Sequence, residues 1–434
     1  MRSFSKKKIL GSLANLQFAI GLLFTIGFVI ALGSIIEQDK NLAFYQENYS
    51  EITPLYGFLS WKTIMFFNLN KIYSAWWFIA ILFLFASSLS ACTFTTQLPS
   101  LKTFKLWKFN ANNIQYKKLG ISDRLDIRCS NNTAYNCNDQ NYHFFRQNRK
   151  SYAYSGLLGR VAPIVVHLSI ILLLLGSTLG SFQGYIAQEI VPRGEIFHVQ
   201  NLTKLGGISY IPQEFSCRVN DFWITYTKEL KTDQFYSDLS ILDRNGKELK
   251  RKTIFVNEPL LFKNLVFYQT DWDILGLSLR FDENKYFQLP LKKIVQNGRK
   301  FWFGSLDLGE KQQLKFTVLI NDLNGKLYIY DSEGILKKET VIGDNFLIRK
   351  AINIQFTGFL TSTGLQMKVD PGIAIIYFSF LLLMVAVYVS FFTYSQIWLV
   401  EKKAAVYIGG KSNRAVLFFQ EEFRKILKRS LHYY

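Results

Sequence analysis

Cysteine and histidine are scarce in this sequence, with four residues of each among 434. The cysteines are Cys92, Cys129, Cys137 and Cys217. No two of them form a C-x-x-C pair, and no cysteine and histidine cluster has the spacing of a zinc site. Unpaired thiols at irregular spacing are typical of a reducing compartment. The sequence therefore argues against a zinc domain, a disulfide framework and a thiol–disulfide oxidoreductase.

Acidic residues are also few relative to basic ones, with 32 Asp and Glu against 51 Lys and Arg. In a soluble protein a net charge of +19 would suggest a nucleic-acid partner. However, the apolar residues cluster in long runs, and the basic residues gather in the segments between those runs. We therefore expect a lipid bilayer, and not a nucleic acid, to account for the charge.

Four apolar runs are long enough to cross a bilayer, which takes about 20 residues. They cover residues 16–36, 75–93, 161–182 and 372–393, and none contains an acidic or basic charge. The first run exceeds the 7–15 residues of a signal-peptide core. We expect it to remain as an anchor, so the sequence predicts four transmembrane helices.

The segments between the runs predict the orientation. Residues 1–15, 94–160 and 394–434 together hold 23 Lys and Arg against six Asp and Glu. Segments rich in Lys and Arg stay on the inner side of a membrane. The basic N-terminus, the 94–160 loop and the 394–434 tail should therefore lie inside. The 37–74 loop and residues 183–370 should then lie outside.

Two segments have the character of membrane-surface elements. Residues 55–77, within the first outer loop, are apolar and aromatic but contain Lys62 and Lys71, which favours an interfacial or re-entrant piece over a span. Residues 415–429 predict an amphipathic helix in the tail, which we expect to lie on the inner membrane surface. Its apolar stripe consists of Phe419, Phe423, Ile426 and Leu427.

The long outer segment, residues 183–370, has the pattern of a β-rich domain. Strands are predicted at 221–228, 234–243, 250–272 with a break at Pro259, 277–281, 298–303, 314–321 and 326–330. An antiparallel sandwich or partial barrel would follow. Asp271, Asp273 and the lone His198 have the pattern of ordinary surface residues, and no catalytic constellation is present. Binding is favoured over catalysis, and enzyme activity is left open.

His167 lies in the third apolar run, about seven residues from Arg160 and hence ~10 Å deep. Lipid offers no hydrogen-bond partner at that depth. The ring could bond to Ser87, Ser88 or Ser90 of the second run, relay protons, or ligate a metal or haem iron. No other run contains a histidine, so a second axial ligand to haem iron would have to come from another polypeptide.

The order of these segments resembles the ResB/CcsB family of system II cytochrome c biogenesis, especially its plastid and cyanobacterial branch. The similar stretches are LANLQFAIGLLFTIGFVIALGSIIEQ at 13–38, YSAWWFIAILFLFASSLSACTFTTQLP at 73–99, GRVAPIVVHLSIILLLLGSTLGS at 159–181, FYSDLSI at 235–241 and VNEPLLFKNLVFYQTDW at 256–272. The fold that the resemblance implies is four transmembrane helices with a large β-rich lumenal domain between the third and fourth.

The resemblance also implies a function. Members of the family form a complex with the membrane subunit CcsA, carry haem to the lumenal side and present it to apocytochrome c for thioether attachment. The membrane histidine of the family matches His167, which makes it the candidate ligand of haem in transit. The implied location is the chloroplast thylakoid membrane, with both termini in the stroma, as a non-catalytic subunit. The alternative is a membrane-anchored scaffold for apocytochrome that does not touch haem.

Overall fold

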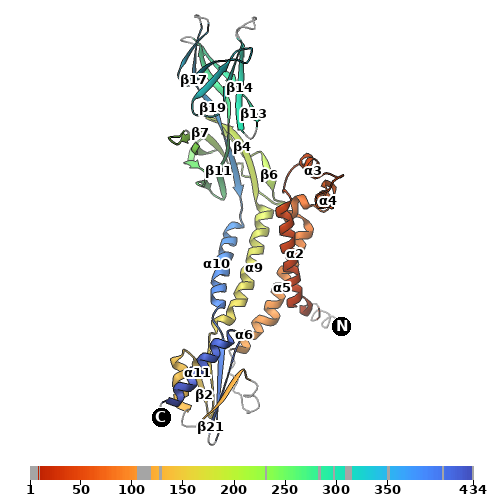
Figure 1. Ribbon diagram of the computed structural model, residues 1–434, viewed down its shortest axis with the longest axis vertical. Coiled ribbons are helices and arrows are strands. Elements are labelled where there is room, and N and C mark those ends of the chain that lie inside the picture. Colours follow the sequence, from red (N-terminus) through yellow and green to blue (C-terminus); the bar gives the residue numbers. More distant parts are fainter. Residues whose placement is uncertain are drawn as a thin grey trace. The chain divides into compact units, whose positions relative to one another are not determined.

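The structure is a computed structural model that describes residues 8, 10–104, 119–126, 130–229, 232–281, 285–296, 299–307, 315–348, 352–402 and 405–432. Some residues named above lie outside these ranges. They are Cys129, residues 1–7 and 9 of the basic N-terminus, and residues 298 and 314, with which two of the predicted strands begin. The chain forms two compact units, drawn in Figure 1. The first comprises Met1–Ser177 and Ile373–Tyr434, and the second Thr178–Gly372.

Four helices are long and apolar enough to cross a membrane, as predicted. They are α2 (Leu16–Ile35), α5 (Trp76–Cys92), α9 (Leu158–Gln183) and α10 (Ile373–Ser390). The second of these does not end at Cys92, because it continues through η2 (Thr93–Gln97) into α6 (Leu98–Phe104). The apolar stretch of this helix therefore runs from Trp76 to Leu101.

Helices α2 and α5 pack side by side (Figure 1), with Ile26 and Val29 buried against Phe78 and Phe85. The chain between them forms α3 (Leu42–Asn48), α4 (Trp61–Phe66) and η1 (Leu69–Ser74). Gln38 ties this connection together. Its amide nitrogen donates to the carbonyls of Ile36 and Leu69 at 2.8 and 3.0 Å, and its amide oxygen accepts from the Ile72 N–H at 3.0 Å. The segment predicted to be interfacial or re-entrant is thus built from short helices.

The second unit is the predicted β-rich domain, and every strand pair described in it is antiparallel. The strands are β4 (Tyr185–Pro192), β5 (Ile196–Phe197), β6 (Leu202–Leu205), β7 (Phe215–Tyr226), β8 (Thr232–Asp243), β9 (Glu248–Phe255), β10 (Leu260–Phe262), β11 (Leu265–Phe281), β12 (Lys285–Pro290), β13 (Lys292–Gln296), β14 (Arg299–Asp307), β15 (Lys315–Ile320), β16 (Lys326–Tyr330), β17 (Leu336–Val341), β18 (Asn345–Ile348) and β19 (Ile352–Val369). They form a seven-stranded sheet around β11 and β19, a four-stranded sheet (β5-β7-β8-β9) and a five-stranded meander (β13 to β17).

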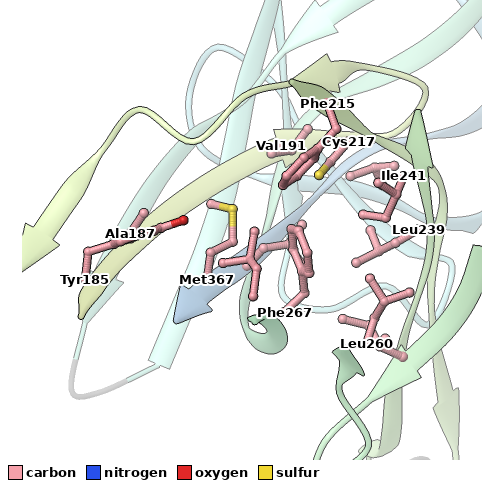
Figure 2. Close-up of a cluster of buried hydrophobic side chains, with 14 residues drawn as sticks. Tyr185, Ala187, Val191, Phe215, Cys217, Leu239, Ile241, Leu260, Phe267 and Met367 are labelled. Atoms are coloured by element: carbon pink, nitrogen blue, oxygen red, sulfur yellow. The ribbon is translucent and has the colours of Figure 1, made fainter. Parts of the chain in front are cut away.

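Two hydrophobic cores share the long strands β11 and β19. In the first core, shown in Figure 2, Phe267 of β11 and Met367 of β19 pack against Leu239 and Ile241 of the four-stranded sheet. In the second, the other halves of β11 and β19 pack against the meander, whose Trp302 is fully buried. The domain is therefore two β-sandwiches that share two strands.

The first unit contains an α/β domain that the sequence did not predict. Its five-stranded antiparallel sheet has the order β1-β21-β20-β3-β2. The strands are β1 (Ile121–Asp126), β2 (His143–Gln147), β3 (Lys150–Ser155), β20 (Ser395–Lys402) and β21 (Ala405–Ser412), and the helices are α8 (Ser130–Asp139) and α11 (Val416–His432). The domain thus combines the basic loop before α9 with the basic tail after α10.

The amphipathic tail helix exists as α11, but the prediction that its apolar stripe lies on the membrane is wrong. Phe419, Phe423, Ile426 and Leu427 are buried in one cluster with residues of the sheet, and α8 contributes Cys137 to the same cluster. The residues of the stripe were identified correctly, but they pack against the sheet. Packing there removes their apolar area from water just as insertion into the membrane surface would.

The α/β domain is joined closely to the membrane helices. Ser395 pairs with both Ser155 and Ser412. The ends of β3 and β21 and the beginning of β20 therefore lie in one row, close in sequence to the start of α9 and the end of α10. Gly156 has a φ of +72°, and a Cβ at this position would overlap the Thr393 carbonyl oxygen. The backbones of the two segments approach so closely here that only glycine fits.

We expect the stability of this domain to depend on Glu422 and on pH. The Tyr142 hydroxyl donates to the Glu422 carboxylate at 3.1 Å and lies 2.8 Å from the Ser395 hydroxyl. Burial raises the pKa of Glu422 above its ordinary value, although the bond from Tyr142 and the charge of Lys425 oppose the change. Because folding favours the protonated acid, the contribution of Glu422 is greatest below pH 4.5 and is lost as pH rises through the folded-state pKa.

The Glu422→Gln variant keeps an oxygen acceptor for Tyr142 and removes the charge. It should melt about 1–2 °C above the wild type at pH 8, a small effect because the site is partly solvated. The difference should vanish near pH 4. The measurement is the melting temperature of the full chain in detergent across this pH range, with the exposed neighbour changed as Glu421→Gln for control. A lower melting temperature of Glu422→Gln at pH 8 would contradict the argument.

Candidate functional site

His167 lies on the face of α9 that packs against the first two membrane helices. Ile170, Ile171 and Leu174, three, four and seven residues further on, contact the buried cluster of α2 and α5. Residues at this spacing share one side of a helix. The ring is half-buried and faces protein, as expected for a polar group at this depth.

The helix opposite His167 is locally widened. Thr93–Gln97 forms a π-helical turn, in which the Leu98 N–H bonds to the Thr93 carbonyl five residues back. Two residues after this turn comes Pro99, which has no N–H to offer the Thr95 carbonyl and would crowd it in a regular α-helix. We attribute the wide turn to this proline. Such single turns occur frequently at functional sites.

Both nitrogens of the imidazole contact residues of this turn. His167 Nδ1 is 2.9 Å from Thr93 Oγ1, and His167 Nε2 is 3.2 Å from Gln97 Nε2. The Thr93 hydroxyl donates its only proton to the Leu89 carbonyl at 2.8 Å. It can therefore only accept from the ring, so Nδ1 carries the hydrogen and Nε2 has the free electron pair.

This tautomer suits a histidine that binds a metal through Nε2. In metal sites the second ring nitrogen donates to a protein acceptor, which fixes the orientation of the ring and leaves the other nitrogen to bind. Thr93 serves as that acceptor here. Gln97 covers Nε2 with its amide nitrogen, and its own Oε1 is buried without a hydrogen-bond partner among the described residues. If Gln97 swings away, Nε2 becomes free to act as a ligand to iron.

The predicted alternative of a hydrogen bond from His167 to the second span is confirmed at Thr93, but the serines named as partners are wrong. Ser87 and Ser90 donate to carbonyls of their own helix, at Phe83 and Ala86, and Ser88 donates to the Leu13 carbonyl at 2.6 Å. None of these three serines reaches the ring. The sequence interpretation missed Gln97 because it ended the second span at residue 93, and it passed over Thr93 at the end of that span. The signal that could have found both residues was the polar TFTTQ beside Pro99.

The remaining sequence candidates form no second site. Among the described residues, no group of three or more His, Cys, Asp or Glu side chains could hold a metal ion. Cys137 and Cys217 are buried, and burial raises the pKa of the Cys137 thiol to about 12, which leaves it unreactive. His198 lies exposed in the β-rich domain.

Asp271 and Asp273, at either side of Trp272, have structural contacts. Lys300 Nζ lies 2.9 Å from Asp271 Oδ1, and Lys293 Nζ lies 3.4 Å from Asp273 Oδ2. Asp273 also accepts from the indole N–H of Trp302, whose ring stacks on Trp272 with centroids 5.1 Å apart. These acids therefore anchor the second sandwich.

Comparison with known proteins places the chain in a family. A model described as the ResB-like family matches residues 16–359 and 295–424. A protein named cytochrome c biogenesis protein Ccs1 from Emiliania huxleyi is 54% identical over 425 residues, which cover 98% of this chain and 97% of that protein. Ccs1 from Pyropia yezoensis is 46% identical, over 96% and 94% of the two chains. Cytochrome c biogenesis protein CcsB from Trichormus variabilis is 41% identical, over 98% and 93%. Since these similarities extend over almost its whole length, the chain belongs to the ResB-like family.

Proposed function

We propose that this chain acts in c-type cytochrome biogenesis, as a membrane subunit that passes haem to apocytochrome c together with a CcsA-type partner. The observation that carries the proposal is the His167 site. Its ring faces protein within the membrane helices, and Thr93 holds it in the tautomer that leaves Nε2 available to iron. The names of the relatives, which are cytochrome c biogenesis proteins, support the same process.

In this proposal haem is cargo that the chain shares with its partner. His167 is the only histidine of the four membrane helices, so the chain supplies one axial ligand and the partner supplies the other. A site with one ligand, covered at rest by Gln97, suits transfer better than storage because the iron can be released by exchanging a single bond. On the outer side the haem vinyl groups would then form thioethers with the cysteines of apocytochrome c.

We further propose that the membrane is the plastid thylakoid, with the β-rich domain in the lumen and both termini in the stroma. The basic segments that favour the inner side support this orientation. Strand pairing adds an independent argument. β3 precedes α9 and β20 follows α10, and the two strands pair. They must lie on the same side, so two crossings separate them. The relatives in algae and a cyanobacterium support the proposed compartment.

A scaffold that holds apocytochrome without touching haem is the second candidate. The observation in its favour is an open groove of about 490 Å³ in the β-rich domain. Arg193 at the end of β4, Leu275 of β11 and Leu360 of β19 are among the residues that line it. Such a lining offers a polypeptide both apolar contact and polar hydrogen-bond partners.

Purification in mild detergent from cells that also express the partner tests the proposal. We expect the complex to contain haem, visible as a Soret band and released by acid, whereas the chain purified alone should contain little. A haem-free complex from cells that still mature their c-type cytochromes normally would refute haem delivery and favour the scaffold.

Thr93 allows a finer test of the site. Thr93→Val has nearly the same shape but cannot accept the Nδ1 hydrogen, so the ring loses its fixed tautomer. Changes to such supporting groups cost metal sites about 10–100-fold in affinity, and we expect a loss of this size in haem retained by the complex. Thr93→Ser keeps the hydroxyl and should retain the haem. If Thr93→Val lowers only the melting temperature, Thr93 has a purely structural role.

A further inference from the structure

One end of the α/β domain is fixed beside the membrane. The row formed by Ser155, Ser395 and Ser412 adjoins the ends of α9 and α10. The turn after Ser412 is attached to the same place: Asn413 N–H donates to the Tyr394 carbonyl at 3.1 Å, and Tyr394 N–H donates to Asn413 Oδ1 at 2.9 Å. The chain that leads into α11 therefore starts at the end of a membrane-spanning helix.

Arg414 strengthens this attachment. Its Nη1 lies 3.2 Å from the carbonyl of Ser390, the last residue of α10. A helix end leaves its final carbonyls without intrahelical partners, and a guanidinium that bonds one of them also complements the helix dipole. Because the side chain of Arg414 is held at the end of α10, the next residues begin α11 at this level.

The first turn of α11 exposes three consecutive apolar side chains. Val416, Leu417 and Phe418 are 51%, 78% and 68% exposed, whereas Phe419, which faces the sheet, is 2% exposed. At the end of α10, Phe391 is 78% exposed. Apolar side chains exposed in such a group mark an interaction site.

The rest of the outer face of α11 is different. Glu421, Arg424, Lys425, Lys428 and Arg429 are exposed along it. Charged side chains therefore replace apolar ones after a single turn, so the apolar surface is confined to the end of the helix that adjoins α10.

We propose that Val416, Leu417 and Phe418 insert into the lipid bilayer beside α10, as an interfacial anchor of the α/β domain. Arg414 attaches this turn to Ser390, the last residue of the membrane-spanning helix α10 and the neighbour of the exposed Phe391, which identifies the occupant as lipid. Lys411 and Arg414 are both exposed and lie within five residues of Val416, so they are placed to meet anionic headgroups. The helix enters by its first turn only, since its charged face and its buried stripe keep the remainder out of the bilayer.

Site-specific fluorescence tests this insertion. In the full chain, Phe418→azidophenylalanine introduces a click-reactive aromatic residue of similar shape, to which a polarity-sensitive dye is attached after reconstitution into phosphatidylcholine–phosphatidylglycerol vesicles. Lys425→azidophenylalanine is the matched control, because position 425 lies two helical turns and about 10 Å further on, at nearly the same angle. Lipids with a nitroxide near the headgroup serve as quenchers.

We expect the dye at position 418 to be blue-shifted and quenched several-fold more strongly by the nitroxide lipids than the dye at position 425. Equal and weak quenching at both positions would overturn the proposal, because the first turn would then lie in water. Equal and strong quenching would also overturn it, since the whole helix would then lie on the membrane. Unchanged circular dichroism and melting temperature of each labelled chain ensure that the comparison concerns folded protein.

Discussion

Replacing His167 by glycine should remove haem from the complex that the chain forms with its partner. The variant lacks the only imidazole of the four membrane helices. We expect haem per complex to fall at least tenfold, which corresponds to about 1.4 kcal/mol of binding free energy. Covalently bound haem in the c-type cytochromes of the same cells should fall in parallel. The measurements are the pyridine haemochrome spectrum of the purified complex and haem staining of denatured membrane proteins.

Two controls separate ligation from folding. Added imidazole can enter the space left by the ring and should restore part of the haem to His167→Gly, which would not occur if the variant were misfolded. His198→Gly removes an exposed histidine of the β-rich domain and should leave haem content unchanged. Normal haem content and normal cytochrome maturation in His167→Gly would rule out the role that we assign to this residue.

Alanine at Gly156 or Gly159 should destabilise the first unit severely. A Cβ on Gly156 would overlap the Thr393 carbonyl oxygen, and one on Gly159 would overlap the Phe392 carbonyl oxygen. Backbone displacement to relieve such overlaps costs about 1–3 kcal/mol. At Gly156 the positive φ adds about 1–3 kcal/mol for a residue with a side chain. We expect a several-fold lower yield of folded protein from each variant and a lower melting temperature in detergent.

Gly120→Ala is the matched control for these variants. Gly120 lies in the same α/β domain without a positive φ, and a Cβ there would come no closer than 3.9 Å to the Gly410 carbonyl oxygen. This change should leave yield and melting temperature nearly unaltered. If Gly159→Ala behaved like Gly120→Ala, the close approach of α9 to the end of α10 would not be needed for stability.

Much of the fold was predictable because its elements are specified locally. A bilayer demands about 20 apolar residues, so each span was visible as an uninterrupted run. In the β-rich domain, aromatic and β-branched strands bounded by turn residues gave β8, β15 and β16 nearly at their observed positions, whereas β7 begins six residues before the predicted 221–228. The two shared strands were less apparent. β19 is 18 residues long, but its sequence INIQFTGFLTSTGLQMKV contains glycine and polar residues that obscure a single strand.

The α/β domain could not be predicted because its strands depend on partners far away in the chain. β20 pairs with β3, about 240 residues earlier, and no local pattern encodes that pairing. The stripe of α11 was recognised from its helical spacing, yet spacing does not distinguish a lipid surface from a β-sheet as the apolar partner. The same limit applies to His167. Its need for a partner followed from its depth, whereas Thr93 and Gln97 depended on a wide turn that Pro99 produces.

The pairing of β3 with β20 also determines when the α/β domain can complete its folding. Strand β3 is synthesised before α9, but its neighbour is not made until the β-rich domain and α10 have followed. During that interval one edge of β3 is unpaired, and eight of the twelve buried residues in the hydrophobic cluster of this sheet have not yet been made. Unpaired strand edges and exposed apolar surface make an incompletely folded chain prone to aggregation. If the polypeptide ends after α10, or if α9 or α10 fails to cross the membrane, β20 cannot reach β3. The edge of β3 then stays unpaired. Closure of the α/β sheet therefore requires that both of the last two crossings, α9 and α10, have been made.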